Sequence, residues 1–558
     1  MKLQKFDIGA EIISILTKGM YPNPYDAVRE YIQNAIDAKA KNVSVKVRNN
    51  TLVIEDDGSG MNHDILRKAL RIGVSDKRPG KDVGFMGIGI YSAYHLCDKL
   101  EIISRGDNDM PNKLTMNFGD MKALLIQQKE QRLKNEISGN DLIDLQSLLE
   151  DYIEITEDNE IPTTDFPEQG TRIKLSDIDP IFYSELSKFN DLADYLREVI
   201  PLHFDKKNFT WGAKIETEII RICDEKNAHF EIINLELQVE ARIETLYRPY
   251  KDIDFNKQGK SPQEPRFYPI KDADTFWGVA WGCLNDIRKV VTTENIRGFI
   301  LKKQGFSIGN RENMVKYFPQ LHTFFDRYVG EIIVTNERLL PTASRNDFEF
   351  SVLRTRFFEA LQEVTAKFDE EGGNFQEWTK ADEEVAKNTE SLKKFNANYN
   401  LAKNAEALVS LISEVKNLSS NIEKRIKRKA FSPDKENYFA TKTKVEELSE
   451  QVKILETSIQ DKINSLIDHK KQTKEDREKS LKITQNIQKL NPPKIEENKY
   501  ESILDLLEDL DIEPNEKLQT ILEILDEKYI ETFAKTKTMY YQILNDLKTE
   551  IQQRLETL

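Results

Sequence analysis

The chain has 558 residues, of which 32% are charged and 39% are hydrophobic. This length exceeds a single hydrophobic core, and the composition favours several ordered domains over wholesale disorder. The net charge of −15 excludes a surface that binds nucleic acid nonspecifically as a whole, although a local basic patch stays compatible with DNA binding. Three widely separated cysteines predict a reducing cytoplasm, and no stretch is long and apolar enough to predict export or membrane anchoring.

The first 175 residues predict an α/β domain. Apolar residues recur at three-to-four spacing between residues 6 and 40, which predicts two helices around the turn TKGMYPNP. The segments VSVKVRN and TLVIEDD alternate and predict a hairpin at Asn49-Asn50. We expect helices at HDILRKALRI and GIGIYSAYHLC and strands at LEIISR and TRIKL, with an acidic, loop-prone insertion over residues 106–169.

Residues 176–361 predict a second α/β domain. We expect strands at KIETEIIRIC, FEIINLELQVEARIETLY, FWGVAWGCL, GFILKKQG and GEIIVTN, with short helices between them. The even spacing of Trp277 and Trp281 places both on one face of a strand. Packing in the core is the favoured role for this pair, with a partner surface as the alternative.

The remaining sequence predicts an all-α region. Apolar residues repeat every seven positions from Leu401 to Ile422 and again from Val445 to Ile459, which predicts two coiled-coil arms within residues 362–492. The break around Pro433 favours an antiparallel hairpin, and residues 493–558 predict a C-terminal helical element. Because a hairpin satisfies heptads within one chain, the pattern does not determine the number of subunits.

A first chemical motif lies in REYIQNAIDA. Glu30, Asn34 and Asp37 are spaced so that one helix presents all three on one face. Glu30 is suited to accept a proton from an attacking water, and the Asn34 amide oxygen is a suitable ligand for Mg²⁺ bound to phosphates. Taken alone, the motif is also compatible with an exposed polar stripe.

A second motif, IEDDGSGM, places Asp56 at the end of a strand before Gly58 and Gly60. A carboxylate accepts a hydrogen bond from an exocyclic amine such as that of adenine, and glycines allow the backbone to approach a ligand closely. A plain β-turn is the alternative for this segment.

The third motif, GFMGIG, contains Gly84, Gly87 and Gly89 at the start of the helix expected at GIGIYSAYHLC. Such a loop can point backbone N–H groups at phosphate oxygens. Lys77, a few residues earlier, adds a positive charge that suits phosphates, with a solvated loop charge as the alternative.

In this order and spacing, the three motifs resemble the N, G1 and G2 boxes of the GHKL ATPase superfamily. The resemblance implies a Bergerat-type α+β sandwich in residues 1–175 that binds ATP and Mg²⁺. It also implies that Glu30 is the catalytic base and Asn34 the metal ligand. The nucleotide-binding residues implied by the resemblance are Asn34, Asp37, Asp56, Gly58, Gly60, Met61, Lys77, Gly84, Gly87, Ile88, Gly89 and Thr171, the last in EQGTRIKL.

Two further segments resemble the Hsp90 branch of this superfamily. GIYSAYHLCDKLEIISR is similar to that family's GFYSAYLVAD-type segment, and GEIIVTNERLLPTASRNDFE resembles its middle-domain LPLNVSRE loop. The resemblance implies that Arg345 is a second catalytic residue, which reaches the γ-phosphate. The short loop SDKRPGKD looks closer to MORC-type ATPases, and the C-terminal third does not resemble the Hsp90 dimerisation domain.

The expected function is therefore an ATP-hydrolysing, homodimeric molecular clamp that remodels a client protein. The alternative is a MORC-like or MutL-like DNA-associated clamp, with a bacterial genome-defence system against phage as one setting for it. In that case DNA would contact the basic residues at the hairpin turn, which are Lys424, Arg425, Lys427, Arg428 and Lys429. The alternative for these residues is a solvated helix face without a binding role. A scaffold that binds ATP without hydrolysing it is disfavoured by the presence of Glu30.

Overall fold

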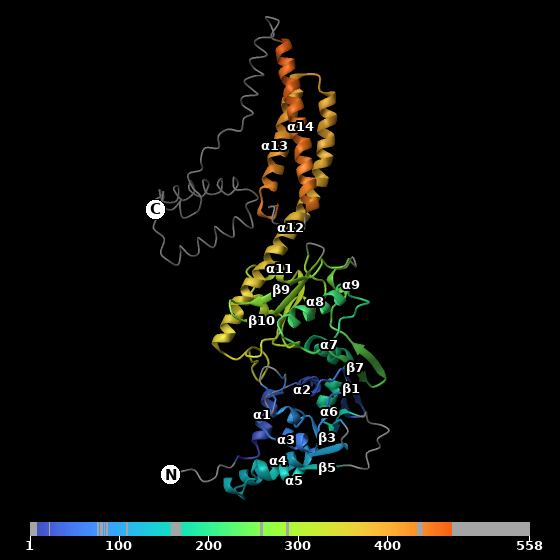
Figure 1. The fold of residues 1–558 in the computed structure, drawn as a ribbon, viewed down its shortest axis with the longest axis vertical. Coiled ribbons are helices and arrows are strands. Elements are labelled where there is room, and N and C mark those ends of the chain that lie inside the picture. The colour runs from blue at the N-terminus through green and yellow to red at the C-terminus, as the bar shows by residue number, and fades with distance from the viewer. Residues whose placement is uncertain are drawn as a thin grey trace, which may run out of the picture. The chain divides into compact units, whose positions relative to one another are not determined.

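The computed structural model describes residues 8–21, 23–74, 77–78, 82, 84, 87–107, 110–157, 169–256, 260–285, 289–431 and 439–470. The chain divides into two compact units, Met1–Thr379 and Lys380–Leu558. Helices alternate with strands in the first unit, and the described part of the second unit is helical (Figure 1). This confirms the expected fold class of α/β regions followed by an all-α region.

The first unit contains an eight-stranded sheet in the order β5-β4-β3-β6-β2-β1-β7-β8. Neighbouring strands are antiparallel except for the parallel pair β1 and β7. The predicted hairpin joins β1 to β2 through Asn49 and Asn50, which both have positive φ as a tight two-residue turn requires. The strands are β1 Asn42–Arg48, β2 Thr51–Asp56, β3 Cys97–Arg105, β4 Asn112–Asn117, β5 Ile153–Glu157, β6 Gly170–Ile178, β7 Asn234–Val239 and β8 Arg242–Leu246.

Seven helices bury residues in one core with this sheet. Alternate strand residues such as Val43 and Val45 contribute the apolar face, while the opposite face is polar, with Glu55 held by Lys46 and Arg172. The result is a two-layer α+β sandwich. Its helices are α1 Ile12–Met20, α2 Pro24–Asp37, α3 His63–Ala69, α4 Phe118–Leu133, α5 Leu145–Tyr152, α6 Pro180–Leu186 and α7 Phe189–Val199.

Two expectations about the extent of this sandwich were wrong. The insertion over residues 106–169 contains β4, α4, α5 and β5, because Leu114, Met116 and Phe118 bury apolar side chains in the core. The strands predicted at FEIINLELQVEARIETLY for the second α/β region extend the first sheet as β7 and β8. There Leu235 and Leu237 join the first core, and the backbone of β7 pairs with β1.

Two predicted elements also have a different secondary structure. The helix expected at GIGIYSAYHLC is only the 3₁₀ turn Gly89–Tyr91 followed by turns, because buried residues follow one another there without helical spacing. The strand expected at KIETEIIRIC is helix α8, Gly212–Asp224. Ile215, Ile219 and Ile222 are buried at a helical period, which overrides their preference for strands.

The second sheet has the order β12-β11-β13-β10-β9, and its central strands are buried on both faces. Helix α8 packs on one face, and the first part of the long helix α12 packs on the other. The strands expected at FWGVAWGCL, GFILKKQG and GEIIVTN are confirmed. The elements are β9 Arg266–Lys271, β10 Phe276–Leu284, β11 Gly298–Lys303, β12 Phe306–Ser307, β13 Tyr328–Val334, α9 Asp252–Phe255, α10 Glu312–Val315 and α11 His322–Phe325.

Trp277 and Trp281 are both fully buried, as expected for core residues. They lie on opposite faces of the second sheet, because the register of β10 shifts between Phe276 and Gly278. Trp277 packs on the side of α12, and Trp281 packs on the side of α8. The prediction that even spacing puts both on one face was wrong, since a bulge interrupts the alternation.

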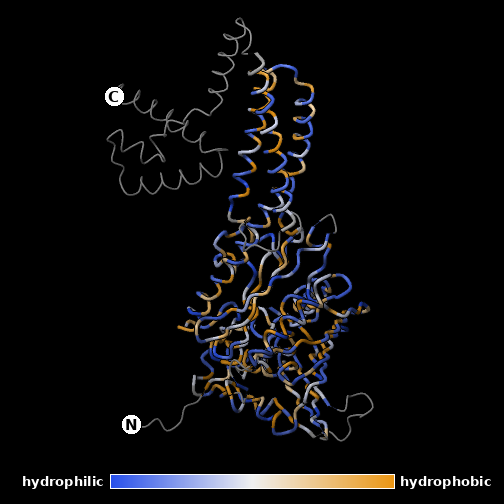
Figure 2. Tube along the Cα trace, turned by 45° about the horizontal axis from the view of Figure 1, so that its top comes forward, coloured by the Kyte–Doolittle hydropathy of each residue, from blue (hydrophilic) through white to orange (hydrophobic). Residues whose placement is uncertain are grey.

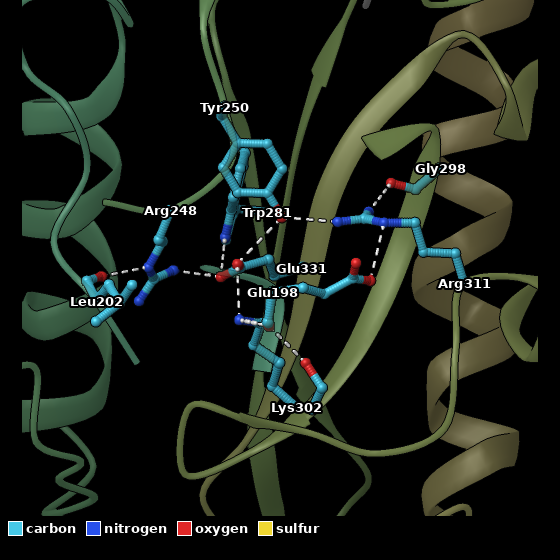
Figure 3. Close-up of polar contacts among 10 residues, drawn as sticks. Glu198, Leu202, Arg248, Tyr250, Trp281, Gly298, Lys302, Arg311 and Glu331 are labelled. Carbon is cyan, nitrogen blue, oxygen red and sulfur yellow. Dashed lines mark hydrogen bonds and ion pairs between the residues drawn. The ribbon is translucent and has the colours of Figure 1, made fainter. Parts of the chain in front are cut away.

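A buried charged cluster joins the two sheets of this unit (Figure 3). Glu331 of β13 forms ion pairs with Arg248 and Lys302 and accepts a hydrogen bond from Trp281. Lys302 donates in turn to the backbone oxygen of Glu198, at the end of α7. Through these contacts the second sheet is attached to a helix of the sandwich.

The second unit begins within α12, which spans Val352–Leu401, and continues with α13 Ala405–Ile426 and α14 Phe439–Lys470. The end of α12 lies beside α14, with Asp382 accepting from Thr441 at 3.0 Å and Tyr399 from Lys462 at 3.0 Å. Apolar positions recur along these helices (Figure 2) and are buried between α13 and α14. The described arms thus include a third helix in addition to the expected pair.

The heptad pattern begins later than predicted. Leu401 is 76% exposed at the end of α12, because the chain turns there and Asn404 caps a new helix. Leu408, Val415 and Ile422 are buried as expected. Pro433 and the predicted element at residues 493–558 lie outside the described residues.

None of the described helices combines the length and apolar character that a bilayer span requires. Cys97, Cys223 and Cys283 are buried and form no disulfide.

Candidate nucleotide site

A cavity of about 340 Å³ lies in the first unit, beside α2 and the ends of β2 and β6. Residues from separate motifs meet in its lining, together with the loop that follows β13. Gly58 and Ile88 are not among the lining residues. The predicted site residues that line the cavity are Glu30, Asn34, Asp37, Asp56, Gly60, Met61, Lys77, Gly84, Gly87, Gly89, Thr171 and Arg345.

Helix α2 supplies the acidic and amide groups of the cavity. Asn23 and Asp26 form a capping box and Pro24 occupies the first turn, which fixes where the helix begins. The apolar face of α2 is buried in the core, so the face with Glu30 turns toward the cavity. Glu30 is only 7% exposed, which excludes the alternative of an exposed polar stripe.

Asp56 lines the cavity from the end of β2. The residue is 8% exposed, and its side chain accepts a 2.8 Å hydrogen bond from the Gly58 backbone, which is the role the structure gives to Gly58. Burial raises the pKa of Asp56 to about 6, while the hydrogen bond from Gly58 acts in the opposite direction. Asp56 is therefore a buried acceptor whose charge changes close to neutral pH.

Thr171 lies opposite Asp56 in the pairing of β2 with β6. Its hydroxyl is 2.9 Å from the hydroxyl of Ser104, which also accepts a hydrogen bond from the Met61 backbone. The sequence reasoning missed Ser104. The signal was its place as a polar residue at an inward position of β3, after the buried Leu100 and Ile102.

Gly60 needs to be glycine for two reasons. Its φ is +64°, and a Cβ atom on it would lie 1.8 Å from the backbone oxygen of Arg105. The close approach brings the segment after β2 against the end of β3, which shapes the wall beside Asp56.

Lys77, Asn34 and Asp37 form a second polar group in the cavity lining. The Lys77 ammonium donates to Asn34 Oδ1 at 2.8 Å and to Asp37 Oδ2 at 2.6 Å. The Gly84 backbone N–H donates to the same oxygen of Asp37 at 3.0 Å. Gly87 and Gly89 line the cavity from a turn and from the start of the 3₁₀ helix Gly89–Tyr91, instead of from the longer helix that was predicted.

Arg345 reaches the cavity from the loop that follows β13. Its Nη2 donates to Gln33 Oε1 at 2.8 Å, and its Nε lies 3.5 Å from Glu30 Oε1. Burial lowers the pKa of Arg345, whereas the charge of Glu30 raises it. The structure therefore places the buried Arg345 side chain beside Glu30 in the cavity lining.

Gln33 and Tyr21 were missed in the sequence. Gln33 is fully buried next to Arg345, and Tyr21 is 3% exposed in the lining. Burial, followed by the charge of Glu30, raises the pKa of the Tyr21 phenol. Gln33 contacts the Arg345 loop, and the two residues are 312 positions apart in the chain. A local sequence pattern cannot predict such a contact.

The lining fits a nucleotide with a divalent cation. It contains the buried acceptor Asp56, amide and carboxylate oxygens from α2, and two cationic residues, Lys68 in α3 and Arg71 in the turn after it. Among the described residues, no three His, Cys, Asp or Glu side chains are grouped to hold a metal ion. A cation at Asn34 would take most of its remaining ligands from water or phosphate oxygens, as is usual for Mg²⁺.

Residues 22–143 match the family model described as histidine kinase-, DNA gyrase B-, and HSP90-like ATPase. A putative type II restriction enzyme, HgiDII of Herpetosiphon aurantiacus, is 30% identical over 115 residues, which cover 19% of each chain. The chaperone protein HtpG of Treponema denticola is 24% identical over 135 residues, or 18% of this chain and 21% of that protein. The chain thus matches about a fifth of the length of each relative. This match to residues 22–143, together with the three motifs around one cavity, identifies the N-terminal region of this chain as a GHKL-type ATPase domain.

Proposed function

We propose that this protein binds ATP with Mg²⁺ in the α2 cavity and hydrolyses it. The observation that carries the proposal is the convergence of Glu30, Asn34, Asp56 and Arg345 on one cavity, although Arg345 comes from the second sheet's loop. Four chemically distinct groups match four needs of ATP hydrolysis: a base, a metal ligand, an adenine acceptor and a cation for phosphate.

Each residue has a defined task in this proposal. Asp56 accepts a hydrogen bond from the adenine amine, with Thr171 and Ser104 fixing its surroundings. Glu30 orients and deprotonates the attacking water, and Arg345 stabilises negative charge on the terminal phosphate. Bound Mg²⁺, held by Asn34 and phosphate oxygens, would neutralise charge on the phosphates.

The placement of Arg345 also supports a clamp. Its loop follows β13, and the second sheet is attached to α7 through Lys302 and Glu198. A change in the cavity therefore reaches the second sheet through the Arg345 loop, which suits a protein whose closure accompanies phosphate binding. We propose a homodimeric clamp that remodels a protein partner, a role supported by the similarity to a chaperone.

A second candidate function is a DNA-associated clamp in a genome-defence system. It is favoured by the similarity to a protein named as a putative restriction enzyme and by the basic cluster at the end of α13. Arg425, however, pairs with Glu384 and its side chain is only 11% exposed, so part of this cluster already has an anionic partner. Reversing the charge of the more exposed Lys424, Lys427 and Arg428 should then weaken DNA binding and reduce its salt dependence.

Steady-state hydrolysis and nucleotide binding by the full chain test the proposed function. Glu30→Gln should abolish turnover while ATP binding persists, and Asp56→Asn should lose binding. Glu55→Gln is the matched control, because Glu55 precedes Asp56 on β2 but points to the polar face, where it pairs with Lys46 and Arg172. If the two site variants behaved like this control, the ATPase assignment of the cavity would have to be withdrawn.

A further inference from the structure

The ammonium group of Lys77 contacts the side-chain oxygen of Asn34, which we assign as a ligand of the metal ion. Its ammonium nitrogen lies 2.8 Å from Asn34 Oδ1 and 2.6 Å from Asp37 Oδ2. The Asp37 side chain is 5% exposed, so its negative charge is almost removed from water. A buried carboxylate needs such a partner, because an unpaired charge in the interior is costly.

Lys77 and a divalent cation cannot share this position. A Mg²⁺ ion bound to the Asn34 oxygen would lie about 2.1 Å from it, and the ammonium nitrogen already lies 2.8 Å from the same atom. A Cβ atom on Gly84 would lie 3.3 Å from Asn34 Oδ1, so the glycine keeps this pair uncrowded. Two cations on one oxygen atom repel each other, so the ammonium group and the metal compete for Asn34.

We propose that Lys77 is an exchangeable internal cation, which holds Asn34 and Asp37 without metal and leaves Asn34 Oδ1 when a divalent cation binds. The inference rests on the proposed function, because it takes Asn34 as the metal ligand. Asp37 keeps a positive neighbour in both states, so its buried charge is never left unpaired. The exchange links occupation of the site to the position of the Lys77 side chain.

The Lys77 side chain is suited to this movement. It is 32% exposed and has a flexible four-carbon stem, so the ammonium group can swing toward the cavity while the backbone stays in place. The cavity is where we place the phosphates, and Lys77 is among its lining residues. On leaving Asn34, the ammonium thus gains anionic phosphate oxygens as new partners.

The exchange predicts that Lys77 weakens metal binding in the nucleotide-free protein. Removing the ammonium should raise the affinity for a divalent cation by roughly tenfold, the size of one charge-assisted hydrogen bond. Loss of any nearby positive charge also strengthens the binding of a metal cation, so a second lysine of the cavity lining provides the comparison. Lys68 lines the same cavity but belongs to α3.

Mn²⁺ binding to the full chain, followed by electron paramagnetic resonance, measures this effect without relying on activity. Lys77→Met and the polar variant Lys77→Gln should both bind Mn²⁺ about tenfold more tightly than the unaltered chain, and more tightly than Lys68→Met. Arg78→Met, which removes an exposed neighbouring charge, should resemble the unaltered chain. Thermal unfolding of each variant verifies that the compared proteins are folded.

Binding of a fluorescent adenine nucleotide in the presence of Mg²⁺ separates the two proposals. A chain that fails to bind nucleotide loses the proposed function itself. If nucleotide binds but the Lys77 variants hold Mn²⁺ no more tightly than Lys68→Met, or hold it more weakly, the exchange is overturned while the ATP site stands. The exchange is supported if both Lys77 variants bind Mn²⁺ more tightly and the Lys68→Met and Arg78→Met variants do not.

Discussion

Arg345 donates a 2.8 Å hydrogen bond to Gln33 on helix α2, and the two residues are 312 positions apart in the chain. The bond places the guanidinium group 3.5 Å from the carboxylate of Glu30, one helical turn away on the same helix. The Arg345 loop is held by the segment after β12, since the Gly309 N–H donates to the Arg345 oxygen at 2.9 Å. Gln33 is thus a hydrogen-bond acceptor on α2 that attaches this loop of the second sheet, beside the ion pair with Glu30.

Replacing Gln33 with alanine should slow ATP turnover with little change in nucleotide affinity. The variant removes the acceptor that orients Arg345, and a hydrogen bond to a charged group contributes about 1.5–3 kcal/mol, which corresponds to roughly 10–100-fold in rate. Steady-state kinetics and nucleotide binding, measured on the same preparation, check this split.

Gln33→Glu is the conservative control, because it keeps an acceptor oxygen for Arg345 and should retain more activity than Gln33→Ala. Equal loss in both variants, or a loss of nucleotide binding in Gln33→Ala, would contradict an orienting role and would point to damage of α2 as a whole.

Asp56 should make adenosine binding depend on pH. Burial raises its pKa from 3.8 to about 6, and the ionised form is the better acceptor for the adenine amine. Affinity should therefore fall as the pH drops from 8 through about 6 toward 5. Adenosine is the suitable probe, because it has no phosphate group that titrates in this range.

The control for this pH profile is Asp57→Asn. The charge of Asp57 contributes to the raised pKa of Asp56, so removing it should move the midpoint of binding to lower pH. A profile that is flat between pH 5 and 8, or that runs in the opposite direction, would remove Asp56 from the adenine contact.

The same carboxyl group should affect stability with the opposite trend. A raised pKa means that the native state holds the proton more tightly, so the contribution of Asp56 is greatest below pH 3.8 and is lost as the pH rises to about 6. The difference amounts to about 3 kcal/mol as an order of magnitude. Asp56→Asn should therefore unfold at a higher temperature than the unaltered chain at pH 7, and a lower temperature would contradict this account.

Glu331→Gln should destabilise the first unit strongly. Glu331 is fully buried with Arg248 and Lys302, so neutralising it leaves two buried cations without their carboxylate, at a cost of about 3–5 kcal/mol. Glu264→Gln is the control, because the Glu264 pair with Lys214 is exposed and contributes at most about 1 kcal/mol. Urea unfolding measures both, and equal effects would exclude a structural role for the buried cluster.

Gly60→Ala should destabilise the sandwich and impair nucleotide binding. The positive φ and the approach to the Arg105 oxygen together cost about 2–4 kcal/mol. Gly73→Ala isolates the first effect, because Gly73 has a similar φ of +70° but open space around its Cβ position, and should cost only about 1–2 kcal/mol. If both variants lost equal stability, the close approach at Gly60 would not matter.

The sequence predicted those elements whose apolar pattern is local. Helix α2 and the hairpin of β1 and β2 follow from helical spacing and from Asn49-Asn50, and the order of the three motifs indicated the family of the ATPase domain. Local chemistry was sufficient because the groups on α2 lie on one helix face. At Trp277 a bulge interrupts the alternation of the strand. In α8 the isoleucines favour a strand by type but are buried at a helical period. Both assignments made from the sequence pattern were therefore wrong.

Tertiary structure decided which residues meet. The parallel pairing of β7 with β1 joins positions about 190 residues apart, and nothing local in NLELQV distinguishes a strand of the first sheet from one of the second. Gln33 with Arg345, Ser104 with Thr171, and Lys77 with Asn34 are contacts of the same kind. A sequence determines which side chains are available along each element, whereas their partners depend on packing that buries apolar surface over the whole unit.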